Sequence, residues 1–186
     1  MPDTDSILTD WNSMDADRAA EAILPCNGSR AWAEGVARLR PLMTAGNLFE
    51  AADRVWRELA ECDWQRAFDS HPRLGEQTAK AASERSLHWS AGEQSAVNPD
   101  EAAREALVRG NKEYEARFGR IFLLCATGRS AQEMLAILRE RMQNDAATEL
   151  HEAAEQQRLI TLLRLRKWLQ MPALTCAELA QRTEAA

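Results

Sequence analysis

LHEAAEQQRLITLLRLRKWLQ, residues 150–170, is the greater part of the longest helical pattern in this chain, which begins near residue 145. The stretch contains neither glycine nor proline, and alanine, leucine, glutamate, glutamine and arginine, which favour helices, make up most of it. Pro172 follows the stretch and marks its end, because proline cannot donate the next helical hydrogen bond. The pattern therefore predicts a long helix over residues 145–170.

The rest of the chain also consists of helix-forming segments between short breaks of glycine and proline. Two segments begin with a capping-box pattern, in which a serine or threonine is followed three residues later by glutamate: Ser130 with Glu133, and Thr175 with Glu178. Helices are predicted over residues 29–40, 47–61, 100–118 and 130–143, and a short helix is predicted to start again near 175–178.

We expect an all-α fold, a single-domain multi-helix bundle that spans residues 1–186. A chain of this length can bury most of its apolar surface in one core. Residues 1–14 are expected to form a loosely ordered N-terminal segment, and residues 173–186 a C-terminal tail or a short helix. Ile121-Phe122-Leu123-Leu124-Cys125-Ala126 is ambiguous, because periodicity does not separate a short buried strand from a buried piece of helix.

Composition and charge disfavour several classes of protein. Apolar residues make up 45% and charged residues 28%, which is typical of a globular domain and not of a disordered chain. The formal net charge of -6 disfavours general nucleic-acid binding, which needs a basic face. No apolar run approaches the roughly 18 residues of a membrane span, and the acidic start lacks the features of a secretory signal. We expect a cytoplasmic protein without nucleic-acid or membrane partners.

The four cysteines, Cys26, Cys62, Cys125 and Cys176, are far apart in the sequence and form no Cys-x-x-Cys pair. This spacing does not favour a zinc knuckle or a thioredoxin-like redox site. Free thiols in a reducing compartment are expected. The three histidines also lack metal-ligand spacing, so we expect no metal and disfavour a metal-dependent hydrolase.

His71-Pro72-Arg73-Leu74-Gly75-Glu76 combines a proton carrier, a break and a carboxylate in one short stretch. Proline fixes its own φ and disfavours helix for the residue before it, so His71 is predicted to lie at a break in the helices, where its ring can face a ligand. An imidazole with a pKa near 6.5 can accept and donate a proton at neutral pH. Alternatively, the ring of His71 caps backbone groups in a turn, and the residues leave both interpretations open.

Ser90-Ala91-Gly92-Glu93-Gln94 is a second polar motif. Ser90 and Glu93 form another capping-box pattern, which favours a structural role at the start of a helix. A binding role is compatible with this structural one, because a helix N-terminus presents unpaired amides and the positive end of its dipole to an anionic ligand.

Arg164 lies one helical turn from Ile160 and from Trp168, so its side chain shares a helix face with apolar residues. This position favours a guanidinium that is turned inward. The alternative is that the aliphatic stem packs while the guanidinium reaches solvent. Arg166 also has leucine neighbours, so periodicity does not choose between the two arginines.

Several short motifs resemble one known enzyme family in their order and spacing. They are His71-Pro72-x-Leu74-Gly75, Ser90-x-x-Glu93-Gln94, Asn111-x-x-Tyr114-x-x-x-Phe118-Gly119, Phe122 to Ala126, and Ile160-x-x-Leu163-Arg164-Leu165. The upstream stretch Cys26-Asn27-Gly28-Ser29-Arg30-Ala31-Trp32 fits as well, so the resemblance covers residues from about 20 to 170. The chain resembles the bacterial branch of 2-oxo-4-hydroxy-4-carboxy-5-ureidoimidazoline (OHCU) decarboxylase, the enzyme of urate breakdown that yields (S)-allantoin.

The resemblance implies an all-helical fold, a decarboxylation without a cofactor and, as in many members, a homodimer. By motif, His71, Glu93 and Arg164 match the family's catalytic residues. The positions that match its substrate pocket are Pro72, Ser90, Ala91, Gly92, Glu93, Gln94, Phe122, Leu123, Leu124, Cys125 and Ala126. The sequence departs from the family at Gly119-Arg120-Ile121-Phe122, where many members carry an aromatic residue and a proline after the glycine.

The residue types suit this reaction. Loss of carbon dioxide leaves an electron pair that spreads into the adjoining ring. A carbon atom of the substrate must then be protonated from one face only. His71 is the expected general acid and base, Glu93 its partner or a ligand of substrate N–H groups, and Arg164 a ligand of anionic or carbonyl oxygens. The competing interpretation is a non-catalytic helical module that binds a small ligand or another protein, with purely structural capping boxes.

Overall fold

The computed structural model describes residues 3–72 and 101–184, and every regular element in these ranges is an α-helix. The all-α prediction is confirmed. The helices are α1 (Thr4–Ser13), α2 (Ala16–Asn27), α3 (Arg30–Ala37), α4 (Ala45–Glu58), α5 (Glu61–Asp69), α7 (Glu101–Phe118), α8 (Ala131–Arg141), α9 (Ala146–Trp168) and α10 (Cys176–Glu184). None of these helices is long and apolar enough to cross a membrane.

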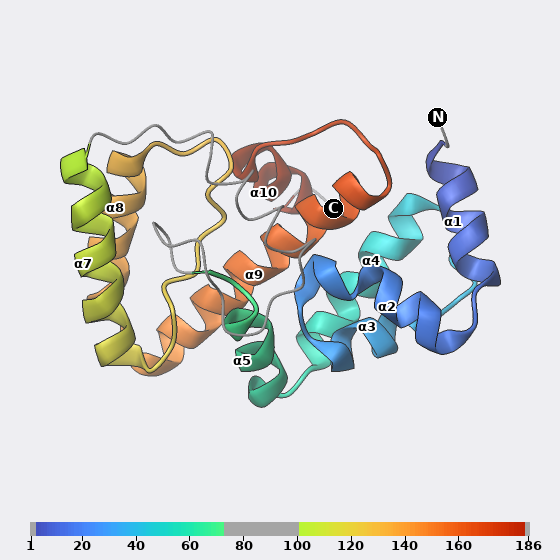
Figure 1. The fold of residues 1–186 in the computed structure, drawn as a ribbon, viewed down its shortest axis with the longest axis horizontal. Coiled ribbons are helices and arrows are strands. Elements are labelled where there is room, and N and C mark those ends of the chain that lie inside the picture. The colour runs from blue at the N-terminus through green and yellow to red at the C-terminus, as the bar shows by residue number, and fades with distance from the viewer. Residues whose placement is uncertain (1–2, 73–100, 185–186) are drawn as a thin grey trace.

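Helix α9 is the central element of the described fold. It packs against α2, α4, α5 and α10, and Figure 1 shows it running from the pair of α7 and α8 toward α1 to α4. Most of α9 is buried, and its buried side chains include polar ones such as Gln156, Gln157 and Thr161. Because buried polar groups need hydrogen-bond partners, α9 is where a polar site can be built into the core.

Residues 121–126 run between two apolar cores. Their odd-numbered side chains belong to the larger core, with side chains of α1 to α5, α9 and α10, and their even-numbered side chains belong to the smaller core, with α7 and α8. Alternation with a period of two is the pattern of an extended chain, whose successive side chains point to opposite sides. The ambiguous segment is therefore not helical, and it forms no strand within the described residues.

Local capping fixes the start of several helices. Ser130 and Glu133 form the predicted capping box before α8, with the Ser130 amide donating to Glu133 Oε2 at 2.7 Å. Thr175 and Glu178 form the equivalent pair before α10, where the amide of Thr175 donates to Glu178 Oε2 at 2.8 Å. The helices predicted over 29–40, 47–61, 100–118, 130–143 and 145–170 correspond to α3, α4, α7, α8 and α9, with ends shifted by up to a few residues.

Two expectations are wrong. Residues 4–13, expected to be loosely ordered, form α1, because Leu8 and Trp11 are buried in the core. Cys125 and Cys176, expected to be free thiols, form a disulfide. They are separated by 51 positions and become neighbours because the start of α10 folds back onto residues 121–127, where the Cys176 amide donates to the Thr127 carbonyl at 3.3 Å.

The ends of α2 and α5, two helices that the sequence patterns did not predict, approach each other closely. Gly28 ends α2 in a left-handed conformation with φ of 94°. A Cβ atom at Gly28 would lie 2.1 Å from Ser70 Oγ and 2.5 Å from Ser70 Cβ. Glycine alone fits both this conformation and this space. The end of α2 therefore packs against the residue that precedes His71.

Candidate active site

His71 lies directly after the C-terminal end of α5. Its amide donates to the Phe68 carbonyl at 3.0 Å, and the Ser70 hydroxyl donates to the Ala67 carbonyl at 2.7 Å. A backbone donor and a side-chain donor thus satisfy carbonyl groups in the last turn of α5. His71 is only 7% exposed, and Pro72 is buried as well. The predicted break in the helices at His71 is confirmed, and the histidine is presented to the interior of the protein.

The surroundings of His71 favour a neutral imidazole. Burial, the largest cause, lowers the pKa of His71 well below 6.5, the nearby positive charge of Arg164 lowers it further, and a polar interaction with the Gln157 side chain acts in the opposite direction. At neutral pH the ring therefore has one N–H donor and one basic nitrogen. Such a group is ready to accept a proton first and to return it afterwards.

Arg164 belongs to α9 and is 1% exposed. Its Nη1 lies 3.5 Å from the Pro25 carbonyl at the end of α2, the outer limit of a hydrogen bond. Its charge lowers the pKa of His71, so the guanidinium and the imidazole lie in one electrostatic environment. Of the two orientations that the sequence left open for Arg164, the structure shows the inward one, and it brings two of the three predicted catalytic residues together.

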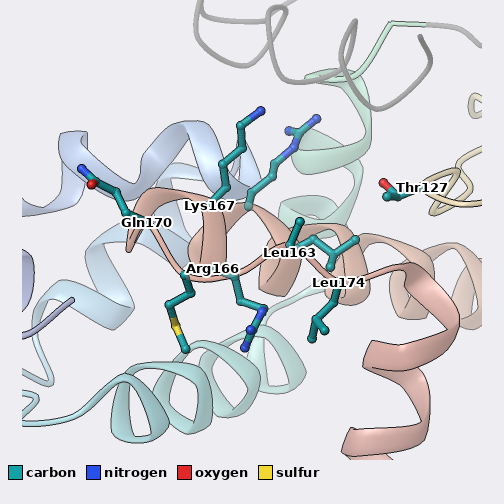
Figure 2. Close-up of a pocket in the computed structure, with 9 residues that line it drawn as sticks. Thr127, Leu163, Arg166, Lys167, Gln170 and Leu174 are labelled. Atoms are coloured by element: carbon teal, nitrogen blue, oxygen red, sulfur yellow. The ribbon is translucent and has the colours of Figure 1, made fainter. Parts of the chain in front are cut away.

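A pocket of about 400 Å³ opens beside Arg164, over the last turns of α9 (Figure 2). Apolar and cationic side chains form most of its wall, together with two neutral polar ones: Thr127, Leu163, Arg164, Arg166, Lys167, Gln170, Met171, Ala173 and Leu174. A pocket of this volume is large enough for a small organic ligand. Three cationic side chains around it favour an anionic one.

The two basic residues after Arg164 extend to different sides of α9. Figure 2 shows Arg166 and Lys167 pointing in opposite directions from the helix. Arg166 donates to the Pro172 carbonyl at 3.1 Å, so its guanidinium holds the turn that follows α9. Arg164 and Arg166 both line the pocket, and Arg164 is the one whose charge lowers the pKa of His71.

Two side chains hold the backbone of the predicted substrate segment, residues 122–126. Gln156 of α9 accepts a hydrogen bond from the Cys125 amide at 3.0 Å, and Arg141 of α8 donates one to the Leu123 carbonyl at 2.7 Å. Gln156 Nε2 in turn donates to Glu152 at 2.9 Å, which fixes the orientation of the Gln156 amide. These side-chain hydrogen bonds satisfy backbone groups of the segment, which neighbouring strands would satisfy in a sheet.

Arg141 is the centre of a buried polar cluster that sequence reasoning missed. Its Nε and Nη2 donate to Glu149 Oε1 at 2.9 and 2.5 Å, and its guanidinium carbon lies 4.8 Å from the centre of the Phe122 ring. Tyr114 of α7 also donates to Glu149, and burial is the largest cause that raises the pKa of Tyr114 above 10. Nothing in the sequence marked Arg141 or Glu149, whereas Tyr114 belongs to one of the family motifs.

Part of the predicted site can be compared directly with the described residues. Glu93 and the rest of residues 90–94 lie outside them. Residues 122–126 contact α8 and α9 through Arg141 and Gln156, and Thr127, which follows them, lines the same pocket as Arg164. Within residues 3–72 and 101–184, no group of three or more His, Cys, Asp or Glu side chains is placed to hold a metal ion.

Sequence comparisons identify related proteins in other organisms. The uric acid degradation bifunctional protein TTL of Arabidopsis thaliana is 33% identical over 144 residues, which are 76% of this chain and 44% of that protein. The 2-oxo-4-hydroxy-4-carboxy-5-ureidoimidazoline decarboxylase of Amia calva is 38% identical over 77 residues, which are 41% of this chain and 43% of that protein. The matches thus span less than half the length of these two relatives.

Solved structures share the fold. The crystal structure of OHCU decarboxylase in the presence of (S)-allantoin aligns with a TM-score of 0.70 and 29% identity over 84% of this chain and 99% of that one. A crystal structure of (S)-allantoin synthase aligns with a TM-score of 0.67 and 19% identity, over 87% of this chain and 53% of that one, and supports the fold alone. The model of the OHCU decarboxylase family matches residues 12–166, and the chain therefore belongs to that family.

Proposed function

We propose that this protein decarboxylates OHCU to (S)-allantoin in urate catabolism. The observation that carries the proposal is the buried pair of His71 and Arg164, a neutral imidazole beside a guanidinium at the edge of a cationic pocket, in a chain of this family. The related OHCU decarboxylase whose structure was solved in the presence of (S)-allantoin supports the choice of product.

The reaction needs a base before it needs an acid. OHCU carries a hydroxyl and a carboxyl group on one ring carbon and the ureido group on the next. When the bond to the carboxylate breaks, carbon dioxide leaves, the electron pair moves into the ring, and the ring nitrogen that receives it takes a proton from solvent. Neutral His71 accepts the hydroxyl proton as that carbon becomes a carbonyl, and the imidazolium then donates the proton to the ureido-bearing carbon.

Delivery of this proton from one side sets the configuration of the product. A 99:1 preference between the two faces corresponds to about 2.7 kcal/mol between two transition states. One charge-assisted hydrogen bond contributes on this scale, about 1.5–3 kcal/mol. A single histidine held in place by burial is therefore sufficient to account for stereocontrol.

The remaining residues bind and orient the substrate in this proposal. Arg164 holds its carboxylate or carbonyl oxygens through a fork of hydrogen bonds. Glu93 is the partner of His71 or a ligand of substrate N–H groups. Pro72, the other residues of the segment 90–94 and the backbone of residues 122–126 orient the ureido and ring groups, which are rich in donors and acceptors.

We infer that the enzyme acts in the cytoplasm as a homodimer, with no partner among nucleic acids or membranes. Proton transfer by His71 and charge stabilisation by Arg164 together supply the acid, base and electrostatic steps, so the proposed reaction needs no cofactor.

Circular dichroism tests the function directly. Urate oxidase and hydroxyisourate hydrolase generate the unstable OHCU in the cuvette, and optical activity is followed with and without this protein. We expect rapid appearance of optically active allantoin when the protein is present. Racemic product at the unaided rate, from protein shown to be folded, would contradict the proposal and favour the non-catalytic binding module.

A further inference from the structure

Gln157 is part of a buried hydrogen-bond network between α2 and α9. The side chain is 0% exposed. Its Nε2 donates to the Asn27 carbonyl and to Thr161 Oγ1, both at 3.2 Å. A side-chain amide nitrogen has two hydrogens, so both donors of Gln157 are used on the side that faces Asn27 and Thr161.

The same network fixes which way round the Gln157 amide lies. Thr161 Oγ1 donates its only hydrogen to the Gln157 backbone carbonyl at 2.8 Å and accepts from Asn27 Nδ2 at 2.9 Å. A flipped amide would place Gln157 Oε1 against the Asn27 carbonyl and Thr161 Oγ1, with no hydrogen available between the oxygens. The nitrogen therefore faces Asn27 and Thr161, and Oε1 points away from them.

Two buried side-chain atoms near this point have no hydrogen-bond partner within the described structure: Gln157 Oε1 and His71 Nε2. An amide oxygen can only accept, whereas a ring nitrogen can carry a hydrogen, so the two atoms are complementary. The Gln157 side chain is also close enough to His71 to raise its pKa, as an acceptor does when it faces the ring.

We propose that Gln157 is a positioning residue for His71: its Oε1 accepts the Nε2–H of the imidazole and leaves Nδ1 as the nitrogen that exchanges a proton with the substrate. The inference rests on the proposed acid and base role of His71 and adds a residue outside the motif-matched set. Gln157 acts through His71 and does not touch the reacting atoms. Asn27 and Thr161 orient the amide, which gives the Cys26-Asn27-Gly28 motif a physical role in the site.

A neutral acceptor suits this position. A carboxylate in place of Gln157 would hold a positive charge on His71 at rest, whereas the amide fixes the tautomer and leaves the resting ring neutral. Once the ring has accepted a proton, the same oxygen accepts a hydrogen bond from the imidazolium. Catalytic histidines depend on such orientation, because the wrong tautomer presents a hydrogen where the base is needed.

The tautomer can be measured without turnover. Two-bond ¹⁵N–¹H spectra of labelled protein distinguish Nε2–H from Nδ1–H, and the signals of His71 are assigned as those that disappear in His71→Gln. We expect the Nε2–H form in the wild-type protein and loss of this preference in Gln157→Leu. A wild-type Nδ1–H form, or an unchanged Nε2–H preference in folded Gln157→Leu, would overturn the inference.

The pH profile of kcat/KM gives a second, charge-based readout. Gln157→Glu keeps the shape and the acceptor oxygen but places a negative charge beside His71, so the acidic limb of the profile should move to higher pH. Gln132→Glu, the same substitution at an exposed position of α8, should leave the limb in place. Gln157→Leu should lower kcat/KM by about 10- to 100-fold, the usual effect of removing an orienting partner. An acidic limb at the wild-type pH in folded Gln157→Glu would count against the inference.

The outcomes separate this inference from the proposed function. A wild-type protein that yields no optically active allantoin defeats the proposed function, and the NMR measurement still decides whether Gln157 fixes the ring. If wild-type protein is active and His71→Gln is not, while both Gln157 variants keep the wild-type tautomer and pH profile, the positioning role alone is wrong.

Discussion

Arg141 and Leu123 are joined by a hydrogen bond of 2.7 Å from the guanidinium to the backbone carbonyl, and this bond ties a buried ion pair to the predicted substrate segment. The same guanidinium pairs with Glu149, whose side chain is fully buried. Replacing both members of a buried ion pair by apolar residues is often tolerated, whereas losing one member is costly. The cluster therefore couples the position of residues 122–126 to the stability of α7, α8 and α9.

Arg141→Met should lower the free energy of unfolding by about 3–5 kcal/mol, because Glu149 would remain buried without its cation. Urea denaturation measures this change. Arg139→Met, at an exposed position of the same helix, should stay within about 0.5 kcal/mol of wild type. The double variant Arg141→Met/Glu149→Leu should recover part of the loss. Equal stability of the Arg141→Met and Arg139→Met variants would show that the ion pair is not needed.

Gly28→Ala should destabilise the protein by more than about 1 kcal/mol, because alanine is strained at φ of 94° and its Cβ would overlap Ser70. Displacement of Ser70 should also lower kcat/KM, since His71 is the next residue. Gly46→Ala is the matched control: its Cβ would meet Thr44 Oγ1 at 3.6 Å, an ordinary contact, and stability should be unchanged or rise by up to about 1 kcal/mol. Thermal unfolding of Gly28→Ala at the wild-type temperature would contradict the close packing at this position.

The buried histidine should make stability depend on pH. Because the pKa of His71 is lower in the folded protein than its value of about 6.5 in the unfolded chain, the unfolded chain binds the proton more readily. The stabilisation that results from this pKa difference is fully present above about pH 6.5. It is lost as the pH falls further, by up to about 1.4 kcal/mol per pH unit, until the pKa of the folded protein is reached. His71→Gln removes this dependence. As the pH falls from about 7 to 5, the free energy of unfolding of the wild-type protein should therefore decrease relative to that of the variant. A constant difference between the two proteins would contradict the shift.

The disulfide between Cys125 and Cys176 should stabilise the protein by constraining the unfolded chain. For a loop closed over 51 positions, chain entropy corresponds to about 4 kcal/mol. Cys176→Ala should therefore melt at lower temperature than wild type under oxidising conditions, and reduction should remove most of the difference. Cys62→Ala, at an exposed position, is the control and should behave as wild type. Alkylation of both Cys125 and Cys176 in unreduced, denatured protein would show that the bond does not form.

The long helices could be predicted because their signals are local. The pattern of α9 and the capping boxes at Ser130 and Thr175 lie within a few consecutive residues. α5 has no side-chain cap at Ala60. α2 has the usual cap residues, Asp15 and Gly28, but contains Pro25 in its last turn, which argues against a helix in the sequence. The disulfide depends on tertiary packing, which no local pattern reports, whereas α1 has a local signal that was overlooked: the N-cap Asp3, whose side chain accepts a hydrogen bond from the Ser6 amide.

The candidate site could be predicted in part, through the motif match. His71 and Arg164 were found in this way, but their shared environment arises from the packing of α5 and α9. Gln157 and Arg141 were missed because the sequence does not show whether a polar residue is buried or exposed. α9 is buried on most sides, so its sequence has no clear amphipathic period that would separate the two cases.

In the proposed mechanism, His71 delivers the proton that sets the configuration of the product. The most direct test compares wild-type protein with His71→Gln by circular dichroism while OHCU is generated in place, with folding of the variant verified by its thermal transition. We expect rapid formation of optically active allantoin by the wild-type protein, and racemic allantoin at the unaided rate with folded His71→Gln. Optically active product at near wild-type rate from His71→Gln would contradict it.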